Sequence, residues 1–339
     1  MQRNERYLSI LENIKKPEDE NINLNDRVLI IDGLNTFIRC FVVNPATNDD
    51  GVHIGGMTGF LKSIGYAIRM HNPTRCIIVF DGKGGSQRRR KVYPDYKANR
   101  KVKHRFNRAY DFNSVDDEQQ SMRFQVSRLV EYLSCLPLTT IMIENIEADD
   151  TMAYLSKSLL KSSEVILMST DKDFIQLVND RISVWSPTKK KLYTPEVVKE
   201  EFQVPSHNLV MYRVIDGDKS DNVPGIKGFG LKSLIKKVPK ILEDEKVTTD
   251  DLIAEGFDTD IINRNYELMQ LDDVNISGKS KLEIQHLLGD TDIKMIKYEF
   301  QKMMLEDKAN TAILNLDSWL AETFNKLNII AMNHNDRLN

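Results

Sequence analysis

The chain has 339 residues, of which 41% are hydrophobic and 29% are charged. This composition is typical of a globular protein with one or two domains and argues against a disordered chain. The formal net charge is −3, so a polyanionic partner would have to be bound by a local cluster of basic residues rather than by the charge of the whole chain.

Residues 1–25 form an N-terminal extension that contains no apolar run followed by a small-residue cleavage site. No later segment has the roughly 18 to 20 apolar residues that a transmembrane helix needs. We therefore expect a cytoplasmic protein without a membrane partner. Cys40, Cys76 and Cys135 lie in apolar stretches without CxxC spacing, which predicts core residues rather than disulfides or zinc ligands.

Between residues 27 and 186, short apolar runs alternate with helical stretches. The clearest runs are RVLIID (27–32), RCIIVFD (75–81), LTTIMIE (138–144) and EVILMS (164–169). Such runs are typical of parallel strands that are buried on both faces. They predict an α/β domain over residues 26–195, with a mostly parallel central sheet flanked by helices.

A basic insertion separates the second and third runs, and it is longer than an ordinary connection in an α/β domain. Within residues 83–108, Tyr93, Tyr96 and Phe106 are interleaved with basic residues, and Asp95 is the one acid. A solvated charge run is the alternative, but aromatics between cations favour phosphate contacts and base stacking. The eleven basic residues are Lys83, Arg88, Arg89, Arg90, Lys91, Lys97, Arg100, Lys101, Lys103, Arg105 and Arg108.

The alternation stops after residue 195, and residues 196–339 are expected to form a helical domain. Its start contains the loop DGDKSDNVPGIKGFG, followed by a lysine-rich helix over residues 232–240. Residues 248–339 are predicted to form amphipathic helices, and no site motif is recognisable in them.

Acidic residues follow all four predicted strands. Because the carboxyl ends of parallel strands share one edge of a sheet, these side chains should lie near one another. So many carboxylates cannot remain close together as free anions. Oxygen ligands without His or Cys suit a hard cation such as Mg²⁺, and their number favours two ions. Helix capping is the alternative for any single acid. The acids are Asp32, Asp81, Glu147, Asp149, Asp150, Asp171 and Asp173, with Asp218 and Asp221 in the later loop.

The order of these motifs resembles that of the 5′-nucleases. IIDGLN, VFDGK, YPDYKANR, IEADD, STDKD and DGDKSDNVPGIKGFG occur in the order found in flap endonucleases, in the 5′-nuclease domains of bacterial DNA polymerases of the first type and in phage 5′-exonucleases, including the T-even-type phage RNase H. The resemblance covers about residues 27 to 240. It implies a PIN-like 5′-nuclease fold, a helical arch at about residues 83–125 and a helix-hairpin-helix-type module at about residues 218–240.

The resemblance also implies roles for individual acids. Asp32, Asp81, Glu147 and Asp149 resemble the ligands of a first, tighter metal ion. Asp150, Asp171, Asp173 and Asp221 resemble those around a second ion, and Asp218 resembles an outer contributor. Two Mg²⁺ ions, replaceable by Mn²⁺, are the implied cofactors, with Asp32, Asp81, Asp149 and Asp173 central to catalysis.

Nucleic-acid contacts follow from the same resemblance. Tyr96 resembles a base-stacking residue, and Lys97 and Arg100 resemble catalytic cations that contact the scissile phosphate. Arg88 and Lys83 match further basic positions. In the hairpin, the implied DNA contacts are Gly225, Lys227, Gly228, Gly230 and Lys232, and main-chain carbonyls there would form a K⁺ or Na⁺ site.

The expected function is structure-specific 5′-3′ exonuclease and flap endonuclease activity in phage DNA replication or repair, with removal of RNA primers. The implied partners of this monomer are DNA with a 5′ flap, nick or 5′ end, an RNA–DNA hybrid, and a single-strand-binding protein or sliding clamp in the host cytoplasm. Two alternatives remain open, a PIN-type ribonuclease and a non-catalytic DNA-junction-binding protein.

Overall fold

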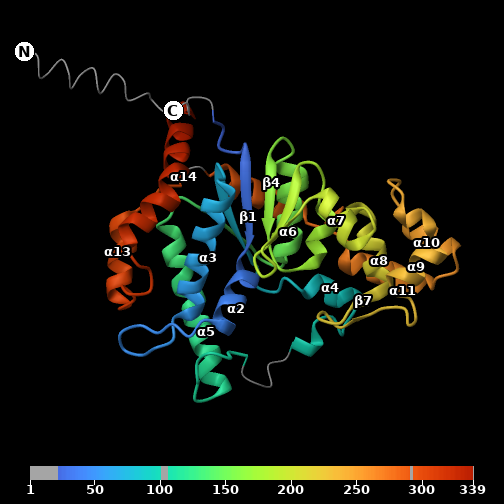
Figure 1. Ribbon diagram of the computed structural model, residues 1–339, viewed down its shortest axis with the longest axis horizontal. Helices are drawn as coiled ribbons and strands as arrows, with labels where there is room; N and C mark the ends of the chain where they lie inside the picture. The colour runs from blue at the N-terminus through green and yellow to red at the C-terminus, as the bar shows by residue number, and fades with distance from the viewer. Residues whose placement is uncertain (1–21, 101–105, 291–292, 339) are drawn as a thin grey trace, which may run out of the picture.

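A computed structural model describes residues 22–100, 106–290 and 293–338 (Figure 1). Within this part of the chain, six strands form one sheet in the order β3-β2-β1-β4-β5-β6. β1 to β5 are parallel, and only β6 is antiparallel to its neighbour. The predicted mostly parallel sheet is confirmed. The strands are β1 (Arg27–Asp32), β2 (Arg75–Asp81), β3 (Thr139–Ile143), β4 (Glu164–Met168), β5 (Ile182–Ser186) and β6 (Lys191–Tyr193).

The central strands are buried on both faces, which explains their continuous apolar sequence. In β1, Val28 and Ile30 belong to the hydrophobic core on one face, whereas Leu29 and Ile31 belong to the core on the other. Successive side chains of a strand point to opposite faces, so a strand covered on both sides needs apolar residues at every position.

The first face of the sheet is covered by helices from both ends of the chain (Figure 1). Phe37 and Phe60 from the N-terminal half share a core with Phe300 and Phe324 from the C-terminal helices. The last helices therefore return to the sheet instead of extending the helical region. These helices are α2 (Gly33–Val43), α3 (Gly55–His71), α5 (Val115–Ser134), α13 (Lys297–Glu306) and α14 (Leu316–Leu338).

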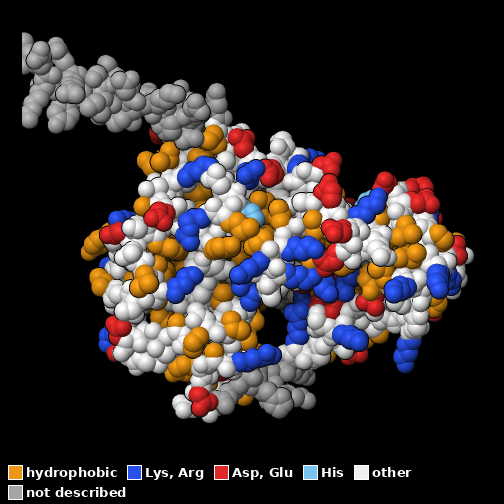
Figure 2. All heavy atoms as spheres, viewed as in Figure 1, with side chains coloured by type: hydrophobic (Ala, Val, Ile, Leu, Met, Phe, Trp, Pro, Cys, Tyr) orange, Lys and Arg blue, Asp and Glu red, His pale blue; other side chains and the backbone are white. Residues whose placement is uncertain are grey.

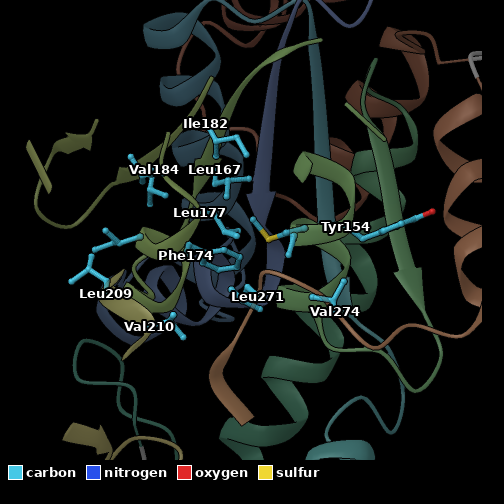
Figure 3. Close-up of a cluster of buried hydrophobic side chains, with 14 of the residues drawn as sticks. Tyr154, Leu167, Phe174, Leu177, Ile182, Val184, Leu209, Val210, Leu271 and Val274 are labelled. Carbon is cyan, nitrogen blue, oxygen red and sulfur yellow. The ribbon is translucent and has the colours of Figure 1, made fainter. Parts of the chain in front are cut away.

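The second face shares one continuous core with the helices that follow the sheet. Figure 3 shows Leu167 and Val184 of the sheet in one cluster with Phe174, Leu209 and Val210. Whether residues 196–339 behave as a separate domain remains a prediction. The elements are α6 (Ala148–Tyr154), η3 (Leu155–Leu159), η4 (Lys172–Leu177), α7 (Pro195–Phe202), η5 (Ser206–Asn208), α8 (Leu209–Asp216), α9 (Leu231–Lys237), η6 (Pro239–Leu242), α10 (Thr249–Ala254), α11 (Thr259–Met269) and α12 (Gly278–Gly289).

The basic insertion begins with α4 (Gln87–Val92) and η2 (Ala98–Arg100) and ends in α5. Lys101, Lys103 and Arg105 lie outside the described residues. The three cysteines are free and buried, as predicted. None of the helices in the described ranges combines the length and the hydropathy needed to cross a membrane.

The strand order places the site at a particular edge. β1 lies between β2 and β4, so the chain runs from β1 through β2 to β3 on one side and then crosses to β4 on the other side, where the strand order reverses. In open α/β sheets, ligands bind beyond the carboxyl ends of the strands at such a reversal. Asp32 at the end of β1 and Asp171 shortly after β4 flank this point.

Candidate active site

Four of the predicted acids line one cavity at this edge. The cavity has a volume of about 540 Å³, and its wall contains carboxylates from the ends of β1 and β2, from α6 and from the segment after β4. Two cations of the basic insertion line the same cavity, which is therefore bordered by both charge signs. The charged residues concerned are Asp32, Asp81, Asp149, Asp171, Lys97, Arg100 and Arg39.

A second, smaller cavity lies beside the first. Its volume of about 10 Å³ is close to the space that a single water needs. Asp149 lines both cavities and is joined here by Asp173, Asp218 and Asp221. The structure thus brings seven of the nine predicted acids to two adjoining spaces.

The same carboxylates that line the cavity also accept hydrogen bonds from nearby backbone and side-chain groups. Asp32 Oδ1 accepts a hydrogen bond from the backbone N–H of Asn35 at 3.1 Å, which caps α2. Its Oδ2 accepts from the Ser169 hydroxyl at 3.0 Å. Asp81 Oδ1 accepts from the backbone N–H of Ala148 at 2.9 Å. These bonds fix the orientation of the acids toward the cavity, so capping and a site role do not exclude each other.

Several of these acids are buried without enough nearby positive charge to stabilise their ionised forms. Burial, with repulsion from neighbouring carboxylates, raises the pKa of Asp32 to about 7 and the pKa of Asp173 to about 7. Burial and nearby acids also raise the pKa of Asp149 and the pKa of Asp171. Such shifts mean that the ionised forms are poorly stabilised by the protein alone. A hard divalent cation is the group that carboxylates without His or Cys fit best.

Glu147 and Asp150 are instead neutralised by the protein's own cations. Arg89, whose side chain is 3% exposed, forms an ion pair with Glu147 and a bidentate pair with Asp150. Lys97 Nζ lies 2.5 Å from Glu147 Oε1. Burial alone would raise the pKa of Glu147, but Arg89 and Lys97 hold it below its ordinary value. Metal ligation by Glu147 or Asp150 would therefore require these pairs to rearrange.

Within residues 22–100, 106–290 and 293–338, no three Asp, Glu, His or Cys side chains are arranged to hold one ion. For Glu147 and Asp150, the pairs with Arg89 and Lys97 draw the carboxylate oxygens toward guanidinium and ammonium groups. The predicted division of the acids between two metal ions remains a prediction.

The basic insertion contacts the site through the residues that the DYKANR motif indicated. Arg100 forms an ion pair with Asp221, and Lys97 Nζ lies 3.9 Å from the same carboxylate. Arg88 Nη2 lies 3.3 Å from Asp150 Oδ2. Lys83 is exposed in the turn after β2 and contributes no side chain to either cavity.

Tyr96 differs from the expected stacking residue in its exposure. Its side chain packs with Val223, Leu268 and Met269 and is only 3% exposed. Its hydroxyl donates to Asp221 Oδ2 at 3.0 Å. In this conformation the ring is covered, so base stacking by Tyr96 remains a prediction that requires the insertion to move.

Figure 2 shows a hollow at the centre of one face of the molecule, with Lys and Arg side chains along its border. In the matching view of Figure 1, α2 lies on one side of this hollow and α4 lies on the other. The basic side chains visible at this hollow therefore lie between α2 and the start of the basic insertion at α4.

The hairpin module is present between α8 and α9. β7 (Gly217–Asp218) pairs with β8 (Val223–Pro224), and Gly228 has φ of +86°. A Cβ at Gly225 would lie 2.1 Å from the Asp216 carbonyl oxygen, so only glycine fits there. Lys227, Gly228, Gly230 and Lys232 are exposed, which leaves them accessible to a ligand.

The family model of the 5′-3′ exonuclease N-terminal, resolvase-like domain matches residues 27–203. The chain belongs to this 5′-3′ exonuclease family.

Curated relatives agree with this family assignment. A 5′-3′ exonuclease of Aquifex aeolicus is 28% identical over 276 residues, which cover 81% of this chain and 88% of the relative. A 5′-3′ exonuclease of Bacillus subtilis is 30% identical over 223 residues, covering 63% and 70% of the two chains. The thermostable DNA polymerase I of Thermus thermophilus is 32% identical over 212 residues, covering 62% of this chain but 23% of that polymerase. The predicted nuclease activity is thereby confirmed.

Solved structures share the fold of the exonuclease. A bacteriophage T5 flap endonuclease, in a pseudo-enzyme-product complex with DNA and metal ions, has a TM-score of 0.58 at 22% identity and covers 83% of this chain and 99% of its own. The T5 5′-exonuclease with bound zinc ions has a TM-score of 0.57 at 21% identity, with the same coverage. The predicted fold class is confirmed by these similarities.

Sequence reasoning missed two site residues of the exonuclease. Arg89 was visible only as one of three consecutive arginines, and nothing in that run distinguishes the buried one. Arg213 lies in an ordinary helical stretch, yet it forms ion pairs with both Asp173 and Asp218. Its position near the end of α8, directly before the loop that carries Asp218 and Asp221, could have indicated Arg213.

Proposed function

We propose that the exonuclease is a Mg²⁺-dependent, structure-specific 5′-nuclease that cuts DNA at 5′ ends and flaps and removes RNA paired with DNA. The observation that carries the proposal is the shared cavity lined by Asp32, Asp81, Asp149 and Asp171 together with Lys97 and Arg100. A cavity with both acids and cations suits a phosphodiester and divalent ions at once.

Two Mg²⁺ ions, replaceable by Mn²⁺, are the proposed cofactors. The buried acids with raised pKa values have the donor chemistry for such ions. The first ion would be held by Asp32, Asp81, Asp149 and Glu147, and the second by Asp171, Asp173, Asp221 and Asp150, with Asp218 contributing from outside. When bound, such ions activate water and stabilise charge on the attacking and leaving oxygens.

The proposed role of Lys97 and Arg100 is to bind the scissile phosphate. Both now pair with carboxylates of the site, Lys97 with Glu147 and Arg100 with Asp221. With the carboxylates engaged by divalent ions, Lys97 and Arg100 would instead pair with the non-bridging phosphate oxygens and neutralise their charge. The phosphate would thereby replace Glu147 and Asp221 as the partner of these two cations.

Duplex DNA would be bound by the hairpin after α8. Lys227 and Lys232 are exposed beside Gly228 and Gly230, so phosphates can approach both the backbone and the ammonium groups. The K⁺ or Na⁺ site at this hairpin belongs to the same proposal. A single-strand-binding protein or sliding clamp as partner and a role in phage replication are further parts of it, supported by the family resemblance alone.

One assay tests the proposal. End-labelled 5′-flap, nicked, single-stranded and RNA-primed DNA substrates, with an RNA hairpin for comparison, are incubated with and without Mg²⁺. We expect Mg²⁺-dependent cutting near the 5′ end or flap junction, determined by structure rather than base sequence. Preferred cutting of the RNA hairpin would support a PIN-type ribonuclease, and binding without any product would support a junction-binding protein.

A further inference from the structure

Arg213 bonds two acids that come from different segments of the chain. It lies in the last turn of α8, and its side chain is 19% exposed. Its Nε donates to Asp173 Oδ1 at 2.9 Å, and its Nη2 donates to Asp218 Oδ2. One guanidinium therefore joins the segment after β4 to the loop after α8.

The Asp218 carboxylate also orders its own loop, and the backbone of Asp173 is bonded to Asp171. Asp218 Oδ1 accepts from the backbone N–H of Ser220 at 2.7 Å, from the Ser220 hydroxyl at 2.6 Å and from the backbone N–H of Asp221 at 3.2 Å. The backbone N–H of Asp173 donates to Asp171 Oδ1 at 2.9 Å. Asp221 and Asp171 are thus each one hydrogen bond away from a residue that Arg213 holds.

The same contacts place a second positive charge near crowded acids. Asp149, Asp173, Asp218 and Asp221 line the smaller cavity together with Arg89. In the described part of the chain, the ion pairs of Asp173 and Asp218 are both with Arg213. An arginine carries its charge on a planar group with several N–H donors in fixed directions, whereas a lysine carries it as a point charge on a flexible chain. Only arginine can hold both acids at a set separation.

We propose that Arg213 is a positioning residue of the exonuclease, which sets the relative positions of the acids around the smaller cavity and so determines how tightly that cavity holds a divalent ion. This inference rests on the proposed function, since it assigns the smaller cavity to an ion. Arg213 acts through Asp173 and Asp218 and does not itself contact substrate.

Three variants separate geometry from charge. Arg213→Met removes the charge and both bonds, and Arg213→Lys keeps the charge but not the planar group. Lys219→Met removes a charge from the exposed lysine next to Asp218, without removing either bond. The first measurement is Mn²⁺ binding by titration calorimetry without DNA. The second is the single-turnover cleavage rate of a 5′-flap substrate at saturating enzyme and Mg²⁺.

For Arg213→Met, we expect weaker binding of one Mn²⁺ ion and slower cleavage, each by about 10- to 100-fold, the usual effect of losing a residue that orients metal ligands. Arg213→Lys should lose most of the same affinity, and Lys219→Met should change both quantities by less than about 3-fold. Circular dichroism and thermal unfolding in EDTA establish that each variant is folded, and an unfolded Arg213→Met leaves Arg213→Lys as the deciding variant.

Tighter Mn²⁺ binding by Arg213→Met would overturn the proposal, because Arg213 would then be a competitor of the ion. Full recovery by Arg213→Lys, or an equal loss in Lys219→Met, would overturn it as well, since charge alone would explain the effect. Failure of the proposed function looks different, because the unaltered protein itself would then give no Mg²⁺-dependent product.

Discussion

The backbone N–H of Lys97 donates to the carbonyl oxygen of Asp221 at 2.8 Å. Lys97 has φ of +56°, a left-handed conformation that is unfavourable for a lysine. Such strain persists where surrounding contacts impose it, commonly at functional sites. Asn99 Nδ2 donates to the Lys219 carbonyl and Asn222 Nδ2 to the Asp95 carbonyl, both at 2.9 Å. Residues 95–99 of the basic insertion are therefore hydrogen-bonded directly to residues 219–222 of the loop after α8.

Lys97→Ala should slow the chemical step far more than it weakens DNA binding. The Lys97 ammonium lies between Glu147 and the larger cavity, where it would neutralise a phosphate only at the reacting position. Single-turnover rates are expected to fall by about 100-fold or more, in the range seen when an electrostatic group at a reacting oxygen is lost. Binding in Ca²⁺ should change several-fold at most, and Lys62→Ala on the surface of α3 serves as the control. Equal losses in rate and binding would reduce Lys97 to a steering charge.

Asp81→Asn should abolish cleavage while leaving duplex binding within several-fold. Asn keeps an acceptor for the backbone N–H of Ala148, which now bonds Asp81 Oδ1 at 2.9 Å, so the local structure should survive. The loss of one anionic ligand weakens ion binding and removes the arrangement that cleavage needs. Cleavage assays in Mg²⁺ and gel-shift binding measure the two effects. A variant that cuts at a near-normal rate would contradict the proposed metal mechanism.

Removal of divalent ions should make the stability of the protein fall more steeply with pH. The carboxyls of Asp32 and Asp173 have folded pKa values of about 7, above the unfolded value of about 3.9. The folded state therefore binds more protons between these values, and stability decreases as pH rises from about 4 to about 7. Bound Mg²⁺ stabilises the ionised form and opposes this decrease.

The measurement is the Tm at about pH 5 and about pH 8, in EDTA and in Mg²⁺. We expect the drop in Tm between the two pH values to be larger in EDTA, and Asp32→Asn should reduce the difference between the two conditions. The same drop in both conditions would show that these carboxyls do not bind the ion.

Asn208→Ala should destabilise the fold without touching the site. The side chain is fully buried, and its Nδ2 donates to the carbonyls of Glu243 and Glu245 at 3.2 and 3.0 Å. Its Oδ1 accepts from the backbone N–H of Val247 at 2.8 Å. Alanine would leave these groups unpaired, so we expect a loss of roughly 2 to 4 kcal/mol in the free energy of unfolding. Urea unfolding measures this loss, with Asn333→Ala at an exposed position of α14 as the control. A change below about 0.5 kcal/mol for Asn208→Ala would contradict the prediction.

The sequence alone was sufficient to predict the central sheet and to identify the acids that lie at its edge. The run RVLIID is apolar at every position because β1 is covered on both faces, and a local pattern of this kind needs no knowledge of distant residues. Asp32 and Asp81 end their strands, and the parallel direction of the strands predicted that the two would lie at one edge. Both line the same cavity.

The tertiary structure alone decided which charges are paired. Arg89 and Arg90 are neighbours in the sequence, yet Arg89 is buried against Glu147 and Asp150 whereas Arg90 is exposed. Arg213 carries no motif, and its role depends on Asp173, which is 40 residues away in the chain. The covered ring of Tyr96 likewise depends on α11. Local sequence patterns are enough to predict which strands are buried and that they run parallel. The energy of an ion pair depends instead on the distance between the charges and on their burial, and both are set by the packing of the whole chain.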